Sequence, residues 1–294
     1  MNDLSLDLLE PYLKVQEERS ILSANEFTKE VLDYYLGGER ITGVKLPFPH
    51  MADRFRLRVG EVTLLGGING SGKSLFAGQL LLCAMIEGKK CFSVSLEMSP
   101  KYQLARMWRQ ASLDVTPTLD YGLAFNSWAS TRLWFLDKEG DIDMTHLHAC
   151  MRYAVDNYGV EYILIDSLMG ISGIRHDDYT AQKELVCKLS DIARELEVHI
   201  ILVAHARKGM SMKEKIDKWS IRGAGELTDR VDNVLLLGRY WRKEDYEAGA
   251  DGYLSIAKAR HFDGAEEEMD LYLDMASMNY YLPSDPPKRM ELDG

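Results

Sequence analysis

A glycine-rich segment that ends in lysine and serine is the strongest chemical signal in the sequence. The pattern G-x-x-x-x-G-K-[ST] is matched in full by Gly67-Ile68-Asn69-Gly70-Ser71-Gly72-Lys73-Ser74. Glycines let consecutive backbone N–H groups turn inward around phosphate oxygens, and the helix that follows directs its positive N-terminal end at the same anion. We predict that Lys73 reaches the β- and γ-phosphates of ATP or another NTP, and that the Ser74 hydroxyl binds Mg²⁺.

Two carboxylates follow apolar, strand-like runs downstream of this P-loop. Asp166 ends the run Tyr162–Ile165, and the carboxyl ends of strands face the ligand crevice in a doubly wound sheet. Asp166 is therefore predicted to hold the Mg²⁺ shell with Ser74, which is the Walker B role. Glu97 ends the run Cys91–Leu96 beside the same crevice and is predicted to activate the attacking water. A helix-capping role is the alternative for Glu97.

The elements that must position these residues alternate between strand and helix from about residue 58. This alternation predicts an α/β fold, with a mostly parallel sheet and helices on both faces. The predicted strands are Glu61–Leu65, Cys91–Leu96, Arg132–Leu136, Tyr162–Ile165, His199–Ala204, Asn233–Leu237 and Leu254–Ala257. The predicted helices include Ser74–Glu87, Pro100–Ser112, Met144–Tyr158 and Thr180–Leu196. The last strands, near 254–258 and 270–281, lack intervening helices and are predicted to form a hairpin-like edge.

Composition narrows the class of protein. The chain has 294 residues and a formal net charge of −11. No run of about 18 apolar residues predicts a membrane span, and the acidic N-terminus is no secretory signal. None of the four cysteines forms a C-x-x-C pair, which favours free thiols in a reducing cytoplasm. The acidic balance argues against a protein that coats DNA with its outer surface, but it allows a few inward-facing loops to grip nucleic acid.

Three segments are predicted. Residues 1–40 form a leader whose short helix follows the capping box Ser23–Glu26 and stops at Gly37-Gly38. Because one short helix cannot bury its own apolar face, we expect it to pack on the main domain or on a neighbouring copy, with a flexible leader as the alternative. Residues 41–283 form the main domain. Residues 284–294 form a polar, proline-rich tail that is expected to be disordered.

Several short elements fall in the order seen in DnaB-type hexameric replicative helicases. They are the P-loop, Ser95-Leu96-Glu97-Met98, the Asp166 strand, Ile201-Leu202-Val203-Ala204-His205, Ile221-Arg222-Gly223-Ala224-Gly225 and Lys258-Ala259-Arg260. Over about residues 40–282 the sequence resembles the motor domain of this family, and it looks closest to phage primase-helicases and mitochondrial Twinkle. The resemblance implies a RecA-like core in a hexameric ring, which hydrolyses ATP with Mg²⁺, translocates on single-stranded DNA and unwinds duplex.

The resemblance also implies roles for individual residues. His205 matches the γ-phosphate sensor, with a locally hydrogen-bonded histidine as the alternative. Arg260 matches an arginine finger supplied in trans to a neighbour's ATP, and Lys258 matches its companion, with a solvated cationic edge as the alternative for both. Arg239 resembles the arginine that stacks on the nucleotide base, where Tyr272 is a candidate for the second face.

The densest basic stretch spans residues 206–218. In the family this segment lines the central channel of the ring, and six copies of a few cations make a positive pore although each chain is acidic. Such phosphate contacts carry affinity without sequence readout. The candidates for DNA contact are Arg207, Lys208, Lys213 and Lys215. A solvated loop is the alternative.

Other classes of protein stay open at this point. One is a RecA- or RadA-like recombination ATPase that forms filaments, and another is a KaiC-like regulatory ATPase. Relatives of the helicase class usually carry a primase-like or collar domain ahead of the motor, where this sequence has at most 40 residues. The chain is therefore expected to be either a minimal helicase or the motor portion of a larger protein, with a primase or a loader protein as a possible partner. A cytoplasmic location is expected, including a host cytoplasm if the protein is phage-encoded, and the mitochondrial matrix stays open.

Overall fold

A computed structural model of the chain describes most of the main domain and part of the leader. The described residues are 23–36, 42–138, 140–172, 178–206, 215–217, 220, 228–240, 249–261 and 267–292.

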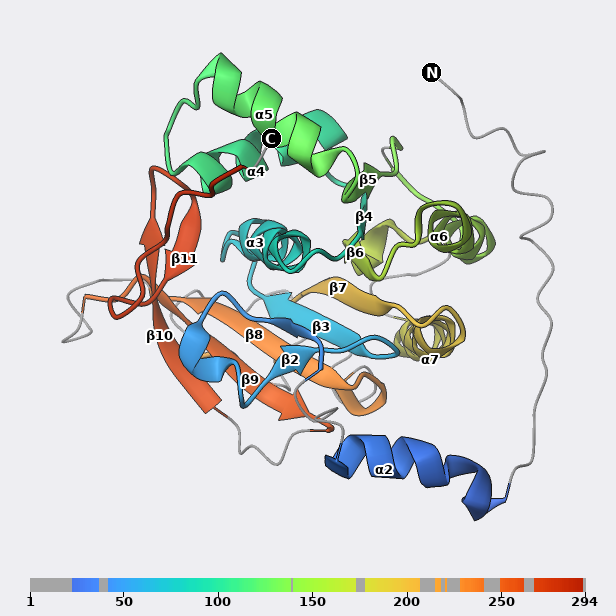
Figure 1. Cartoon of the computed structure of the whole chain (residues 1–294). Helices are drawn as coiled ribbons and strands as arrows, with labels where there is room; N and C mark the ends of the chain where they lie inside the picture. Colours follow the sequence, from blue (N-terminus) through green and yellow to red (C-terminus); the bar gives the residue numbers. More distant parts are fainter. Residues whose placement is uncertain are drawn as a thin grey trace.

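A nine-stranded sheet forms the centre of the molecule (Figure 1). Its strand order is β11-β10-β9-β8-β3-β7-β6-β4-β5, and a separate two-stranded sheet pairs β1 with β2. The strands are β1 (Val44–Lys45), β2 (Arg56–Leu57), β3 (Val62–Gly67), β4 (Cys91–Ser95), β5 (Leu133–Phe135), β6 (Tyr162–Asp166), β7 (His199–His205), β8 (Asn233–Arg239), β9 (Gly252–Ala259), β10 (Glu267–Asp274) and β11 (Asn279–Tyr281). Strands β8, β3, β7, β6, β4 and β5 run parallel, whereas β9, β10 and β11 are added antiparallel. The predicted α/β class and its antiparallel edge are confirmed.

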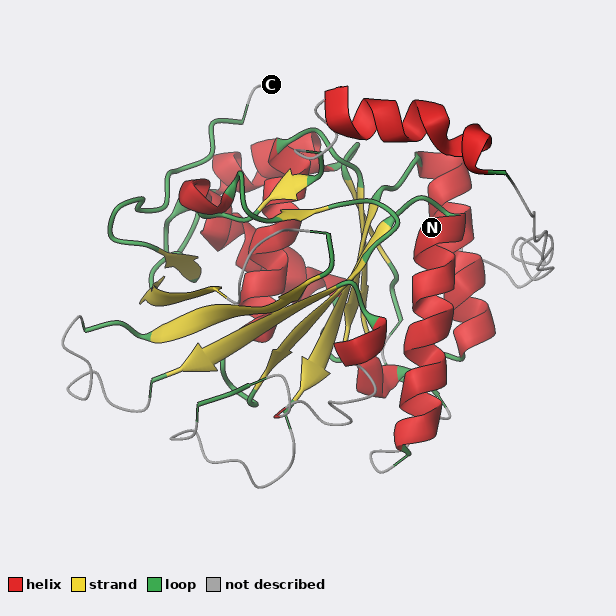
Figure 2. Ribbon diagram, turned by 90° about the horizontal axis from the view of Figure 1, so that it is seen from below, coloured by secondary structure: helices red, strands yellow, loops and turns green. Residues whose placement is uncertain are grey.

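Helices cover both faces of the sheet, as Figure 2 shows. The helices of the described residues are α2 (Thr28–Leu36), α3 (Lys73–Ile86), α4 (Pro100–Ser112), α5 (Leu119–Ala129), α6 (Met144–Tyr158) and α7 (Tyr179–Glu195), with short 3₁₀ turns at Ala24–Phe27, Pro49–Met51 and Leu168–Gly170. One core cluster lies between the sheet and α6 and α7. The other joins the opposite face to α3, α4, α5 and the β1–β2 sheet. The central strands are apolar on both faces for this reason.

Helix α5 was not among the predicted helices. Its sequence carries Gly122 in the interior, and glycine disfavours helix by about 1 kcal/mol relative to alanine. Packing accounts for the glycine, because a Cβ there would lie 2.2 Å from the ring of Trp108 on α4. The Trp108 indole N–H then donates to Asn126 Oδ1 at 2.9 Å. Tertiary contact with α4 therefore stabilises a helix that the local sequence does not indicate.

The C-terminal tail packs against α4 and α5, which contradicts the expected disorder. Met290 N donates to Ala111 O at 2.8 Å, and the Tyr121 hydroxyl donates to Met290 O at 3.1 Å. The Arg289 guanidinium lies 4.7 Å from the centre of the Tyr121 ring. Backbone hydrogen bonds and a cation–π contact thus hold a segment whose composition alone suggests disorder.

The leader helix α2 exposes its apolar side chains. Phe27 and Val31 are 43% and 51% exposed, and Tyr35 is 68% exposed. The expected packing of these residues on the main domain is therefore not found, and packing on a neighbouring copy stays a prediction. Among the helices of the described residues, none has the length and apolar character needed to cross a membrane.

Candidate functional site

The register of the parallel strands brings the residues predicted for phosphate binding and catalysis together at the carboxyl ends of the strands. Gly67, at the end of β3, pairs with His205 at the end of β7. On the other side of β7, the pairing of β6 with β4 sets Asp166 opposite Ser95, two residues before Glu97. These strands end on the side of the sheet where the P-loop leads from β3 into α3. The P-loop, the sensor position and both carboxylates therefore face one crevice.

Lys73 begins α3 and turns back over the P-loop. Its Nζ donates to Gly67 O at 3.0 Å and to Ile68 O at 2.9 Å. The residue is only 5% exposed. Burial lowers the pKa of Lys73 to about 8, although the nearby charges of Asp166 and Glu97 act in the opposite direction. A buried ammonium that has only carbonyl partners is arranged to receive an anion.

Asp166 is buried at the end of β6 and is 5% exposed. Burial raises its pKa, with a smaller rise from the charge of Glu97, whereas a hydrogen bond from the Ser74 side chain and the charge of Lys73 lower it. Asp166 Oδ1 is buried without a hydrogen-bond partner. A carboxylate beside a hydroxyl, with one unsatisfied buried oxygen, is a donor set suited to Mg²⁺.

Glu97 stands at the mouth of the same crevice, with its side chain 51% exposed. Its Oε1 accepts a hydrogen bond from Ser167 Oγ at 2.6 Å and lies 3.3 Å from His205 Nε2. Burial acts to raise the pKa of Glu97, but the hydrogen bonds from Ser167 and His205, together with nearby positive charge, outweigh it and lower the pKa. Glu97 is therefore ionised near neutral pH and is linked to the sensor position, as a base for water requires.

The residues present fit a magnesium nucleotide. Gly70 and Gly72 of the P-loop both have positive φ, a conformation that glycine adopts at no steric cost. Lys73 would meet the terminal phosphates, and Ser74 with Asp166 would hold Mg²⁺. The Ser71 Oγ is also buried without a partner. These assignments stay predictions.

Lys258 and Arg260 lie at the opposite ends of the strands, beside the start of β3. Asn233 pairs with Thr63 near the start of β3 and with Ala259 near the end of β9. From Thr63 to Gly67 the strand covers about 13 Å, at roughly 3.3 Å per residue. Neither cation therefore serves the P-loop of its own chain, which is the geometry that a contribution in trans requires.

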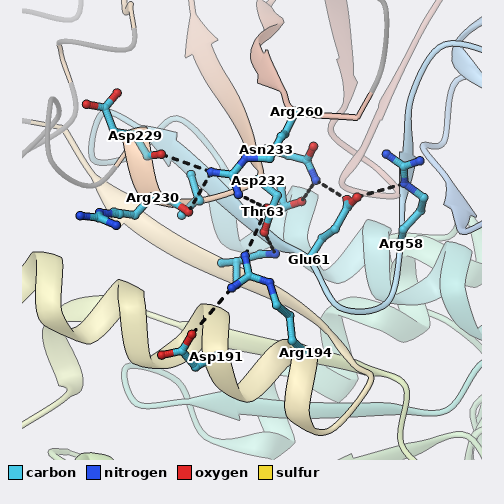
Figure 3. Close-up of polar contacts among 12 residues, drawn as sticks. Arg58, Glu61, Thr63, Asp191, Arg194, Asp229, Arg230, Asp232, Asn233 and Arg260 are labelled. Carbon is cyan, nitrogen blue, oxygen red and sulfur yellow. Dashed lines mark hydrogen bonds and ion pairs between the residues drawn. The ribbon is translucent and has the colours of Figure 1, made fainter. Parts of the chain in front are cut away.

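Both cations contact the same segment, residues 228–232, and Figure 3 shows the contacts of Arg260 with it. Lys258 Nζ donates to Thr228 O and Val231 O, each at 2.8 Å. Arg260 Nη1 donates to Asp232 Oδ1 at 2.9 Å and stays 38% exposed. Arg260 also lines an open cavity of about 520 Å³ with Lys183, Arg194 and Arg230. Asp191 and Asp229 also line this cavity, in which Arg260 is held in place but remains accessible.

A sequence profile of a family described as AAA domain matches residues 48–211, which is more than half of the chain. The chain belongs to this AAA-domain family. The matched region contains the P-loop, Glu97, Asp166 and His205.

Two solved structures share the fold of this AAA domain. One, described as an ATPase domain, superposes with a TM-score of 0.74 at 19% identity, covering 89% of this chain and 99% of that one. A DnaB-like replicative helicase, described with its interactions with primase, gives a TM-score of 0.69 at 18% identity, covering 94% of this chain and 70% of that one. The RecA-like core and its likeness to DnaB-type motor domains are thus confirmed at the level of the fold.

A curated relative comes from another class. The circadian clock protein KaiC3 of Synechocystis sp. is 28% identical over 159 residues, which is 50% of this chain and 29% of the relative. The AAA domain therefore spans less than a third of the length of that relative.

The fold does not bring Arg239 and Tyr272 together. Arg239 pairs with Gly252 on β9, and Gly252 pairs with Leu271 on β10. Paired residues share a face and neighbours alternate, so the side chain of Tyr272 belongs to the other face. The tyrosine on the Arg239 face is instead Tyr280, because it pairs with Leu273, two residues after Leu271. Sequence reasoning missed Tyr280, for which the run Asn279–Leu282 at the end of the edge hairpin was the available signal.

Of the predicted DNA-contacting stretch 206–218, the structure describes residues 206 and 215–217. Arg207, Lys208 and Lys213 lie outside the described residues. Lys215 Nζ forms an ion pair with Glu268 Oε1 at 2.8 Å, and its side chain is 69% exposed. An exposed pair of this kind contributes little to stability, and DNA contact by Lys215 stays a prediction.

Proposed function

We propose that this AAA domain is the ATP-hydrolysing motor of a ring-forming replicative DNA helicase. In the proposal, the chain binds ATP with Mg²⁺, assembles head to tail into a hexameric ring, and translocates on single-stranded DNA while unwinding duplex. A primase or a loader protein is the proposed partner.

The proposal rests on one observation: the residues predicted to act on ATP lie at two opposite ends of the strands of one sheet. One end holds the P-loop with Glu97, Asp166 and His205, and the other end holds Arg260 and Lys258. A second copy placed head to tail would bring its Arg260 next to the P-loop of the first copy. Repetition of that heterologous contact closes into a ring when the rotation allows it.

The proposed roles follow from the local geometry. Lys73 binds the terminal phosphates, Ser74 and Asp166 hold the cation, and Glu97 orients and deprotonates water. His205, 3.3 Å from Glu97, relates the state of the γ-phosphate to the base. Arg260 of the neighbouring copy stabilises the charge that develops in the transition state.

Strand displacement tests the proposal. A forked duplex with one labelled strand is incubated with the protein, ATP and Mg²⁺, and the released strand is measured over time. Unwinding by the wild type, its absence with Lys73→Ala, and a ring of about six subunits in electron micrographs are the expected results. ATP hydrolysis without any strand release, on forks of either polarity, would contradict the helicase assignment.

A regulatory ATPase is the second candidate, and the similarity to KaiC3 favours it. A switch of that class would hydrolyse ATP at a rate that single-stranded DNA leaves unchanged. A RecA- or RadA-like recombination ATPase would respond to DNA but would assemble into filaments. DNA stimulation combined with particle shape therefore separates the three.

A further inference from the structure

The P-loop is held from outside by a tyrosine that lies far away in the sequence. Tyr280, on β11 at the far edge of the sheet, donates its hydroxyl to Ser71 O at 2.6 Å, across a separation of 209 residues. The tyrosine is 3% exposed. This is a direct side-chain contact between the C-terminal hairpin and the phosphate-binding loop.

The contact fixes the orientation of one peptide group of the loop. The Ser71 carbonyl and the Gly72 N–H belong to the same trans peptide, so they point in opposite directions. While Tyr280 holds the carbonyl on one side of the loop, the Gly72 N–H points to the opposite side, where we expect the phosphate oxygens to bind.

Tyr280 also accounts for the glycine at position 72. Gly72 has φ +89°, which disfavours a side chain, and a Cβ there would lie 2.3 Å from the Tyr280 hydroxyl oxygen. Two separate constraints thus require glycine at this position, and one of them is the tyrosine itself.

The helix that follows the P-loop holds Tyr280 in position. Gln79 of α3 donates from Nε2 to Tyr280 O at 2.7 Å, and its Oε1 accepts a hydrogen bond from Tyr280 N at 3.1 Å. The edge of the ring packs against Phe76, with 6.1 Å between ring centres and 80° between the ring planes. The tyrosine, the loop and the first turns of α3 therefore form one unit.

The phenol keeps its proton under ordinary conditions. Burial raises the pKa of Tyr280 to about 12, although the charge of Arg239 acts to lower it. The hydroxyl is therefore a hydrogen-bond donor throughout the neutral range.

We propose that Tyr280 is a positioning residue of the nucleotide site, whose hydroxyl orients the Ser71–Gly72 peptide toward the β-phosphate of the bound nucleotide. Tyr280 acts through the loop and does not touch the nucleotide. The proposal rests on the nucleotide-binding part of the proposed function and does not depend on DNA unwinding.

Replacement by phenylalanine tests this with the ring retained. Tyr280→Phe is expected to weaken ADP binding by about three- to tenfold, as for the loss of one orienting hydrogen bond, and to leave AMP binding unchanged because AMP has no β-phosphate. The readout is the ratio of the two dissociation constants, measured by calorimetry or by displacement of a fluorescent nucleotide. Tyr281→Phe is the matched control, since Tyr281 pairs with Tyr272 on the other face of the hairpin, and it should leave the ratio unchanged.

Two results would overturn the proposal. One is ADP binding by Tyr280→Phe that equals that of the wild type. The other is an equal loss for ADP and AMP, which would mean that the tyrosine supports the fold or the base side of the site. If the wild type itself binds no ADP, the proposed function fails at the nucleotide site. If only the Tyr280→Phe ratio is unchanged, the positioning role fails alone.

Discussion

The charge of Lys73 should make nucleotide affinity depend on pH. Burial lowers the pKa of Lys73 to about 8 in the chain without nucleotide. A bound triphosphate favours the ammonium, so the pKa in the complex is higher than in the free chain. Binding then takes up a proton above about pH 8, and affinity falls as the pH rises through that value. Below about pH 7 the lysine is charged in both states and has no such effect.

The magnitude follows from the fraction of free chains that carry the charge. If the lysine in the complex stays protonated to above about pH 9.5, the association constant for ATP at about pH 9 is roughly tenfold lower than at about pH 7, or about 1.4 kcal/mol. Phosphate groups with a second pKa of about 6 are already ionised above about pH 7.5 and do not interfere.

Calorimetric titration with ADP or a slowly hydrolysed ATP analogue between about pH 7.5 and 9.5 measures the effect. Lys73→Arg keeps its charge at these pH values and should show a flat profile, and Lys73→Ala should bind weakly at every pH. Tight, pH-independent binding by the wild type would refute the argument that a partly deprotonated lysine meets the phosphates.

The same pKa affects the stability of the chain without nucleotide. An unfolded lysine holds its proton up to about 10.5, so between about pH 8 and 10.5 the unfolded state binds more protons and the free energy of unfolding rises with pH. The contribution of Lys73 is about 3 kcal/mol at most. It is measured as the difference in the free energy of unfolding between the wild type and Lys73→Met. In Lys73→Met, residue 73 should cause no rise in that free energy over this pH range.

Three other changes test the remaining parts of the site. Glu97→Gln should bind ATP normally but hydrolyse it about 10²–10⁴-fold more slowly, and unchanged turnover would place the base elsewhere. Lys208→Ala combined with Lys213→Ala should lower the salt dependence of single-stranded DNA binding by about 0.7 per lost contact while basal ATPase survives, whereas an unaltered slope would favour a solvated loop. Arg260→Ala should bind ATP but lose about 10³–10⁵ in rate, and mixing it with Lys73→Ala should restore part of the activity, because some interfaces then combine an intact P-loop with an intact finger. A purified Arg260→Ala protein with normal turnover would exclude the finger role.

Much of the fold was predictable because the strands that form it are continuous apolar runs. Strand β6, for example, spans Tyr162–Asp166 and is buried along its whole length. A strand that is apolar on both faces indicates a covered parallel sheet without any knowledge of its neighbours. The P-loop was equally predictable, since a contiguous motif determines its own position at the junction of a strand and a helix.

The features that were missed depend on contacts between distant segments. Helix α5 contains Gly122, whose place is set by Trp108, and the C-terminal tail is held by Tyr121. On the edge hairpin, a shift of one residue moves a side chain to the opposite face of the sheet. Pattern reasoning placed Tyr272 beside Arg239 at the nucleotide base, whereas the strand register puts Tyr272 on the other face of the sheet.

The proposed role of Arg260 depends on a second copy of the chain. Its distance from its own P-loop follows from the strand register, which a linear sequence does not specify. The resemblance to ring helicases supplied the prediction of a contribution in trans, and the register supplies the reason that a contribution in cis is excluded.

Steady-state ATP hydrolysis by fractions of known mass, with and without saturating single-stranded DNA, tests the central claim most directly. The proposed ring motor predicts that specific activity rises as subunits assemble, and that single-stranded DNA raises it further in the assembled fraction. Full activity from a demonstrated monomer, indifferent to single-stranded DNA, would contradict the account.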